Sequence, residues 1–151
     1  TGTWWSLGGV VDVANDTGVT YINGVAEGSR TYTLPGSTFV NSTPTNADII
    51  GGGGAPPGGT AEQVDGRIAE MAIWKIDIGA NAFTQLAKGY SPLFFPNGLV
   101  FYTPLYGNNS PEKDRLSTIS GTITGTVASA AHPTVFYPET RTNTGYRMGA
   151  R

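Results

Sequence analysis

The chain has 151 residues, no cysteine and a single histidine, His132. The lack of cysteine excludes disulfide frameworks, thiol catalysis and cysteine-ligated zinc. One histidine cannot build a histidine-rich metal site. His132 is followed directly by Pro133, and the sequence contains no nucleophile-elbow motif, so a structural role is favoured over that of a hydrolytic base.

Charge is also scarce, because charged residues make up 13% of the chain and the formal net charge is −2. Nothing in this balance attracts nucleic acid or an anionic membrane, and we expect neither as a partner. No apolar run approaches the ~20 residues of a transmembrane helix, and no signal-peptide pattern is visible. Whether further residues precede Thr1 stays open.

Glycine (22) and proline (10) are abundant, and helix-forming stretches are rare. This composition predicts a single all-β domain over residues 1–137, followed by a polar, basic tail over residues 138–151. The nine residues 51–59, GGGGAPPGG, cannot hold regular structure and are interpreted as a flexible connection or a lip beside a ligand.

Several elements can be predicted individually. Asn23-Gly24 lies between β-forming residues and predicts a tight hairpin. Gly8-Gly9 is expected to separate two short strands, Thr3–Leu7 and Val10–Val13. Ser91–Pro96 and His132–Tyr137 are expected to be extended, and Leu99–Leu105 to form a strand that Pro104 interrupts.

The most informative stretch is Asp65–Tyr90. Its apolar run Ile68–Ile76 predicts a long strand covered on both faces. Ala80–Lys88 is the one window with helix-like content, and Gly89 fits a helix C-terminal cap.

These pieces, taken together, resemble a known family. Tyr21-Ile22-Asn23-Gly24, Ile49-Ile50-Gly51-Gly52, Asp65-Gly66-Arg67-Ile68-Ala69-Glu70 and the helix around Phe83–Leu86 are similar to the concanavalin A-like (laminin G-like) jelly-roll lectin domain, of the kind found in bacteriophage structural proteins. The resemblance implies a jelly-roll β-sandwich. The hairpin comes early in this chain, and residues 98–105 resemble the strand that usually opens the family's domain. A permuted, truncated or strand-sharing sandwich is therefore expected.

The same resemblance frames the search for catalysis. Glycosidases of this superfamily carry a carboxylate cluster on one strand, because an acid and a nucleophile must flank the same bond. Glu70 is the one acid within Ile68–Ile76, so we expect a hydrogen-bonded or arginine-paired structural role for it and no enzymatic activity.

Two binding sites remain as hypotheses. Family members often bind calcium, and Asp12, Asn15 and Asp16 offer hard oxygen ligands in one turn, although such residues more often cap the local backbone. Sugars stack on exposed aromatic rings beside polar partners, and the candidates for such a site are Trp5, Tyr32, Asp48, Tyr90 and Tyr106.

The leading functional hypothesis is a non-enzymatic structural or attachment module of a virion, such as a capsid decoration or fibre-associated protein. It would sit in a homo-oligomer or against other virion or surface subunits, which would cover edges that a lone sandwich leaves open. The alternative is a carbohydrate-binding module of a secreted or cell-surface protein. No cofactor is expected apart from calcium.

Overall fold

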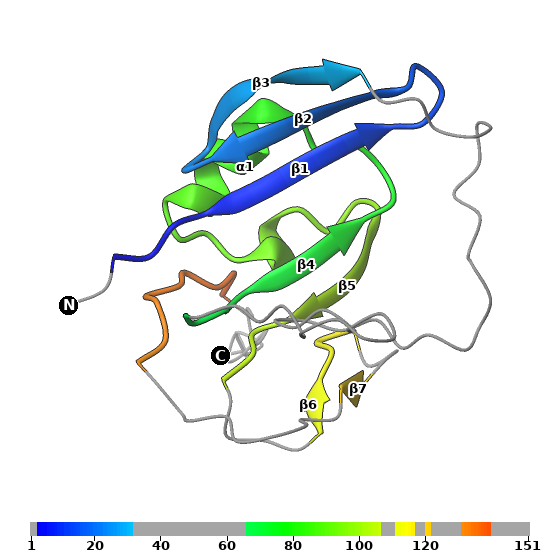
Figure 1. Cartoon of the computed structure of the whole chain (residues 1–151). Helices are drawn as coiled ribbons and strands as arrows, with labels where there is room; N and C mark the ends of the chain where they lie inside the picture. Colours follow the sequence, from blue (N-terminus) through cyan, green and yellow to red (C-terminus); the bar gives the residue numbers. More distant parts are fainter. Residues whose placement is uncertain (1–2, 32–65, 107–110, 117–119, 122–130, 140–151) are drawn as a thin grey trace, which may run out of the picture.

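The computed structural model describes residues 3–31, 66–106, 111–116, 120–121 and 131–139, and the structural statements below concern these residues. They form three small antiparallel sheets and one α-helix (Figure 1), which agrees with the predominantly β fold expected from composition. Within these ranges no helix is both long and apolar enough to cross a membrane.

The first sheet contains β1 (Leu7–Asp12), β2 (Thr17–Ile22) and β3 (Val25–Thr31), in that order. The turn between β2 and β3 is the predicted Asn23-Gly24 pair, with φ angles of 50° and 79°. Both positions are in the left-handed region that a type I′ hairpin turn needs. The hairpin prediction is therefore confirmed.

The prediction of two strands separated by Gly8-Gly9 is wrong, because β1 runs unbroken through both glycines. Gly8 pairs with Tyr21 and lies against the ring of Phe83. A Cβ atom at position 8 would lie 2.5 Å from that ring. The glycine is thus needed for close packing rather than for a turn.

Helix α1 (Gly79–Ala87) matches the predicted helix to within one residue and covers one face of the first sheet (Figure 1). Its Phe83 ring stacks on Tyr21 with ring centroids 4.1 Å apart. At the C-terminus, Gly89 N–H donates to Leu86 O and Tyr90 N–H donates to Gln85 O. Together with the φ of 89° at Gly89, these bonds form a Schellman cap, as the glycine predicted.

The second sheet pairs β4 (Met71–Trp74) with β5 (Leu99–Thr103). The predicted long buried strand over residues 68–76 is wrong in length and in burial. Glu70 has a φ of 57°, which breaks the extended chain just before β4. Ile73 in the middle of β4 is 47% exposed, so the apolar run does not indicate a strand covered on both faces.

The remaining elements are short. Strand β5 ends at Thr103, directly before Pro104, as the interrupting proline predicted. The segment expected to be extended over residues 91–96 instead contains the 3₁₀ helix η1 (Pro92–Phe94), whose first turn is capped by the Ser91 hydroxyl. The third sheet pairs β6 (Glu112–Lys113) with β7 (Ser120–Gly121).

The C-terminal segment, residues 131–139, lies beside the end of α1. Phe136 N–H donates to Gly89 O at 2.8 Å, and Ser91 N–H donates to Phe136 O at 2.9 Å. These two bonds form an isolated parallel bridge between Tyr90 and Phe136. The glycine-rich stretch 51–59, most of the strand expected at 117–127 and nearly all of the basic tail lie outside the described residues.

Candidate functional site

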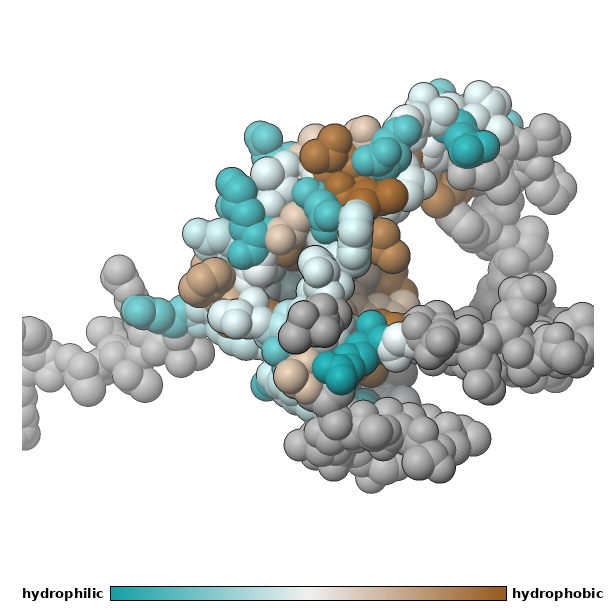
Figure 2. All heavy atoms as spheres, turned by 60° about the vertical axis from the view of Figure 1, so that its left-hand side comes forward, coloured by the Kyte–Doolittle hydropathy of each residue, from teal (hydrophilic) through white to brown (hydrophobic). Residues whose placement is uncertain are grey.

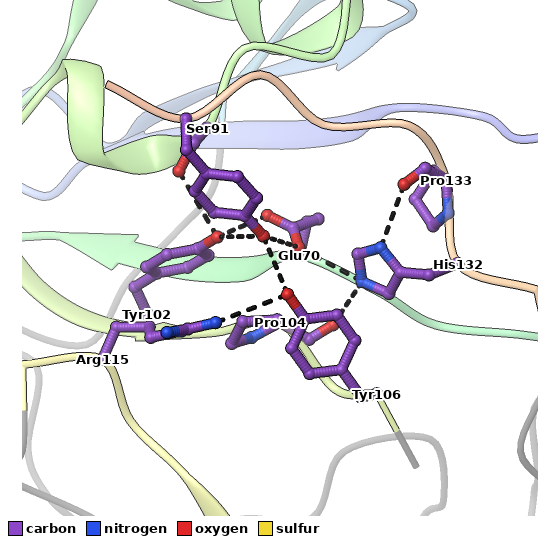
Figure 3. A network of polar contacts seen from close by, with 9 residues as sticks. Glu70, Ser91, Tyr102, Pro104, Tyr106, Arg115, His132 and Pro133 are labelled. Atoms are coloured by element: carbon purple, nitrogen blue, oxygen red, sulfur yellow. Dashed lines mark hydrogen bonds and ion pairs between the residues drawn. The ribbon is translucent and has the colours of Figure 1, made fainter. Parts of the chain in front are cut away.

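The densest group of polar side chains surrounds the carboxylate of Glu70, just ahead of β4 (Figure 3). Its Oε2 accepts a 2.6 Å hydrogen bond from the Tyr102 hydroxyl of β5. Its Oε1 accepts a 3.2 Å bond from Tyr137 and lies 3.2 Å from Nε2 of His132. Three segments distant in sequence therefore meet at one carboxylate.

Further donors extend this cluster in two directed chains. Because Tyr137 donates to Glu70, the 3.2 Å contact between Tyr106 and Tyr137 has Tyr106 as its donor. Arg115 in turn donates to the Tyr106 hydroxyl at 3.4 Å. On the other side Ser91 donates to Tyr102 at 3.3 Å. Every proton in both chains points toward the carboxylate, an arrangement in which neighbouring hydrogen bonds polarise one another.

Backbone contacts hold the cluster in place. Glu70 N–H donates to Pro104 O at 3.1 Å, which joins the start of β4 to the end of β5. Tyr102 N–H donates to a carboxylate oxygen of Asp114 at 2.9 Å, and Arg115 N–H donates to Tyr102 O at 2.7 Å. The segment after β6 thus orients β5 and delivers Arg115 to the cluster.

The tyrosines at the centre of the cluster are held in their protonated form. Burial, followed by the hydrogen bond to Glu70, raises the pKa of Tyr102 to about 12. Burial and the hydrogen bonds with Tyr102 and Tyr106 also raise the pKa of Tyr137. A phenolate beside an ionised carboxylate would be disfavoured by like charge and by lost hydration. These two hydroxyls consequently act as donors, not as nucleophiles.

This geometry determines what the cluster can do. The hydrogen-bonded role predicted for Glu70 is present, with tyrosine and histidine as its partners in place of arginine. The side chains of His132 and Glu70 are only 19% and 15% exposed. Within the described residues, Glu70 is the one acid that bonds to these tyrosines, so the cluster lacks the paired carboxylates of a glycosidase. Its evident effect is to bind the segments together.

The proposed sugar-binding residues do not converge. Trp5 is 63% exposed ahead of β1, and no printed contact joins it to the other candidates. Tyr90 is exposed beside Phe94 and Phe136, with ring centroids 5.4 and 5.7 Å away. Tyr106 belongs to the Glu70 cluster. Tyr32 and Asp48 lie outside the described residues.

The turn proposed to hold calcium is closed by its own hydrogen bonds. Asp12 Oδ1 accepts from the backbone N–H groups of Ala14 and Asn15, and Oδ2 accepts from the Asn15 side chain at 2.6 Å. The bonds from Asn15 lower the pKa of Asp12. Asp16 stands next in the turn with a φ of 53°. Within the described ranges no group of three His, Cys, Asp or Glu side chains is placed to hold a metal ion. Calcium binding stays a prediction that would require Asp12 to exchange its present partners.

A second feature is the outer face of the first sheet, opposite α1. Successive residues of a strand point to opposite faces, and Gly8 and Tyr21 face Phe83. The register then places Leu7, Ile22 and Val25 side by side on the outer face. Leu7 is 75% exposed and Val25 63%. Figure 2 shows apolar surface at the height that this sheet and α1 occupy in Figure 1.

Sequence reasoning did not find the assembled cluster. It treated Glu70 and His132 separately, because they are 62 positions apart and no motif links them. The tyrosines carry no signal either, since Tyr102 and Tyr106 fall in a stretch that reads as an ordinary strand and its end. Comparison of the chain with protein-family models, curated proteins and solved structures finds no match.

Proposed function

We propose that this chain is a non-enzymatic structural or attachment module of a virion, such as a capsid decoration or fibre-associated protein, built on a permuted or strand-sharing jelly roll. The proposal makes the module part of an assembly, in which copies of the chain or other particle subunits cover its apolar surface. Its place is the virion or an extracellular surface.

The observation that carries the proposal is the small apolar core of the described residues. Their buried apolar side chains are Ala82, Phe83 and Tyr102. Many more large apolar side chains are exposed: Trp4, Trp5, Leu7, Val11, Val25, Ile68, Ile73, Ile76, Tyr90, Phe94, Val100, Phe136 and Tyr137. Exposed apolar groups that gather on one face mark interaction sites. The outer face of the first sheet, with Leu7, Val11 and Val25, is the best-defined such surface.

The Glu70 cluster supports a structural role over a catalytic one. Its tyrosines are protonated donors, and its carboxylate is already saturated with hydrogen bonds from Tyr102 and Tyr137. A general base or nucleophile needs an oxygen free to reach a substrate. The cluster instead joins the start of β4, the end of β5 and the C-terminal segment.

The test is association of the purified chain, followed by light scattering over a range of concentrations. We expect a concentration-dependent oligomer that weakens in the Val11→Thr and Val25→Thr variants, which keep the β-branched shape but add a hydroxyl to the outer face. Ile73→Thr, an equivalent change in β4, serves as the matched control. A chain that remains a folded monomer and never joins a particle would overturn the proposal.

A specific observation favours the alternative function, a carbohydrate-binding module. Tyr90, Phe94 and Phe136 form a contiguous group of exposed aromatic rings, and such rings can stack on sugar faces. A glycan array, read with and without calcium, tests this function. Binding that is lost in Tyr90→Ala and kept in Trp5→Ala would place the sugar on this group; silence across broad glycan classes would exclude it.

A further inference from the structure

The ring of His132 is surrounded by hydrogen-bond acceptors. Its Nε2 lies 3.0 Å from Pro104 O and 3.2 Å from Oε1 of Glu70, and its Nδ1 lies 3.0 Å from Pro133 O. Carbonyl oxygens and an ionised carboxylate can only accept. A neutral imidazole carries one N–H group, so one ring nitrogen would direct its lone pair at an oxygen lone pair. The imidazolium, with a proton on each nitrogen, satisfies both sides.

The other groups around His132 are compatible with this charge. Glu70 supplies the opposite charge from the segment before β4. Tyr106, after β5, packs its ring against the imidazole with centroids 4.7 Å apart. Tyr137 and Tyr102 reach the site through Glu70 as neutral donors. The nearest cation among the described contacts, Arg115, is directed at the Tyr106 ring, 6.0 Å from its centroid, and to its hydroxyl.

These contacts also fasten the C-terminal segment. His132 attaches its beginning, and Tyr137 attaches its end to the same carboxylate. Between them Phe136 makes the two backbone bonds of the bridge to residues 89–91. The side chain of Phe136 is exposed, so its burial contributes little to holding the segment. The polar attachments carry a correspondingly large share.

We propose that His132 and Glu70 form a pH-dependent latch that fastens residues 131–139 to the sheet formed by β4 and β5. The latch is closed while Glu70 is ionised and both nitrogens of His132 are protonated. It loosens when His132 loses its second proton, because one nitrogen then repels its acceptor. Histidine is the side chain that ordinarily changes charge between about pH 5 and pH 8. The segment would thus be released near neutral or mildly alkaline pH and held in mild acid.

Amide hydrogen exchange of the full chain, followed by NMR, tests the latch. The reporters are the amides of Phe136 and Ser91, which make the two bridge bonds. The reference is the Asn23 amide, which bonds to Ser6 O in the hairpin at 2.8 Å. After correction for the intrinsic exchange rate at each pH, we expect protection of Phe136 and Ser91 to fall several-fold from pH 5 to pH 8, with Asn23 unchanged. His132 is the sole histidine, so its ring signals report the same titration directly.

Two variants separate the latch from a general loosening. In His132→Gln, which does not titrate, protection of Phe136 should no longer depend on pH. In Tyr137→Phe, which removes only a neutral donor to Glu70, protection should be lower at every pH and keep the same pH dependence. Protection in the unaltered chain that stays constant across this range, or that falls equally at Asn23, would overturn the proposal even if a variant fails to fold. A His132→Gln variant that retains the pH dependence would overturn it as well.

Discussion

The Tyr102 hydroxyl donates a 2.6 Å hydrogen bond to Oε2 of Glu70, across 32 positions of sequence. The bond joins a buried ring on β5 to the residue that precedes β4, and it is the shortest contact of the Glu70 cluster. Hydrogen bonds to charged acceptors contribute about 1.5–3 kcal/mol, more than neutral ones. The stability of the second sheet is therefore tied to a polar pair rather than to an extensive apolar core.

Replacing Tyr102 by phenylalanine tests this pair. We expect Tyr102→Phe to lower the free energy of unfolding by roughly 1.5–3 kcal/mol, because Glu70 loses its closest donor while the ring stays in place. Urea denaturation measures the change. Tyr21→Phe is the matched control, since no printed hydrogen bond involves the Tyr21 hydroxyl and its ring would still stack on Phe83. An equal loss in both variants would contradict the assignment.

Alkaline pH should destabilise the fold through the same tyrosine. The pKa of Tyr102 is about 12 in the folded chain, against a model value of 10.0. Because the folded pKa is the higher one, its contribution to stability is complete below pH 10 and is lost as the pH rises through 12. The loss is on the order of 2 kcal/mol. Unfolding measured against pH, with tyrosinate absorbance recorded in parallel, should show it, and Tyr102→Phe should reduce this part of the pH dependence.

Gly8 and Gly9 offer a comparison within one strand. In Gly8→Ala the new methyl group would lie 2.5 Å from the Phe83 ring, whereas at Gly9 the nearest atom is Val19 O at 3.7 Å. Overpacking typically costs about 1–3 kcal/mol, so Gly8→Ala should lower the melting temperature clearly. Gly9→Ala should be neutral or slightly stabilising, because alanine restricts the unfolded chain. Similar effects at both positions would contradict the packing of α1 on this face.

Mild acid should loosen the turn between β1 and β2. The pKa of Asp12 is below its model value of 3.8, chiefly because of the side-chain hydrogen bond from Asn15. A lowered folded pKa means that the contribution is present above pH 3.8 and disappears as the pH falls through the folded value. Carboxyl NMR signals of Asp12 and exchange of the Ala14 amide would record this together. In Asn15→Ala the Asp12 titration should move upward; an unchanged titration would contradict the cause.

Local features of the fold were predictable where a few neighbouring residues decide the conformation. The hairpin at Asn23-Gly24 follows from the need for positive φ at two successive positions, and the cap at Gly89 follows from the same need at the end of α1. The predictions failed where distant contacts decide. Gly8 reads as a break until Phe83 is placed above it, and the apolar run at residues 68–76 reads as buried until Glu70 turns the chain.

The site shows the same division more sharply. Trp5 and Tyr90 were chosen as exposed aromatics, and the structure leaves both exposed. Tyr106 was chosen for the same reason and instead belongs to a polar cluster. No spacing rule connects Glu70, Tyr102 and His132, because they lie on separate segments whose meeting depends on sheet pairing and on the position of the C-terminal segment.

The sequence by itself determined the β-rich character of this protein, its hairpin and its capped helix, and it excluded thiol and histidine-cluster chemistry. Those properties depend on composition and on the conformational preferences of adjacent residues. Only the tertiary structure decided that β1 is continuous, that one sheet face remains apolar and exposed, and that two chains of donors converge on Glu70. Each of these depends on contacts between residues far apart in sequence, whose geometry no local pattern records.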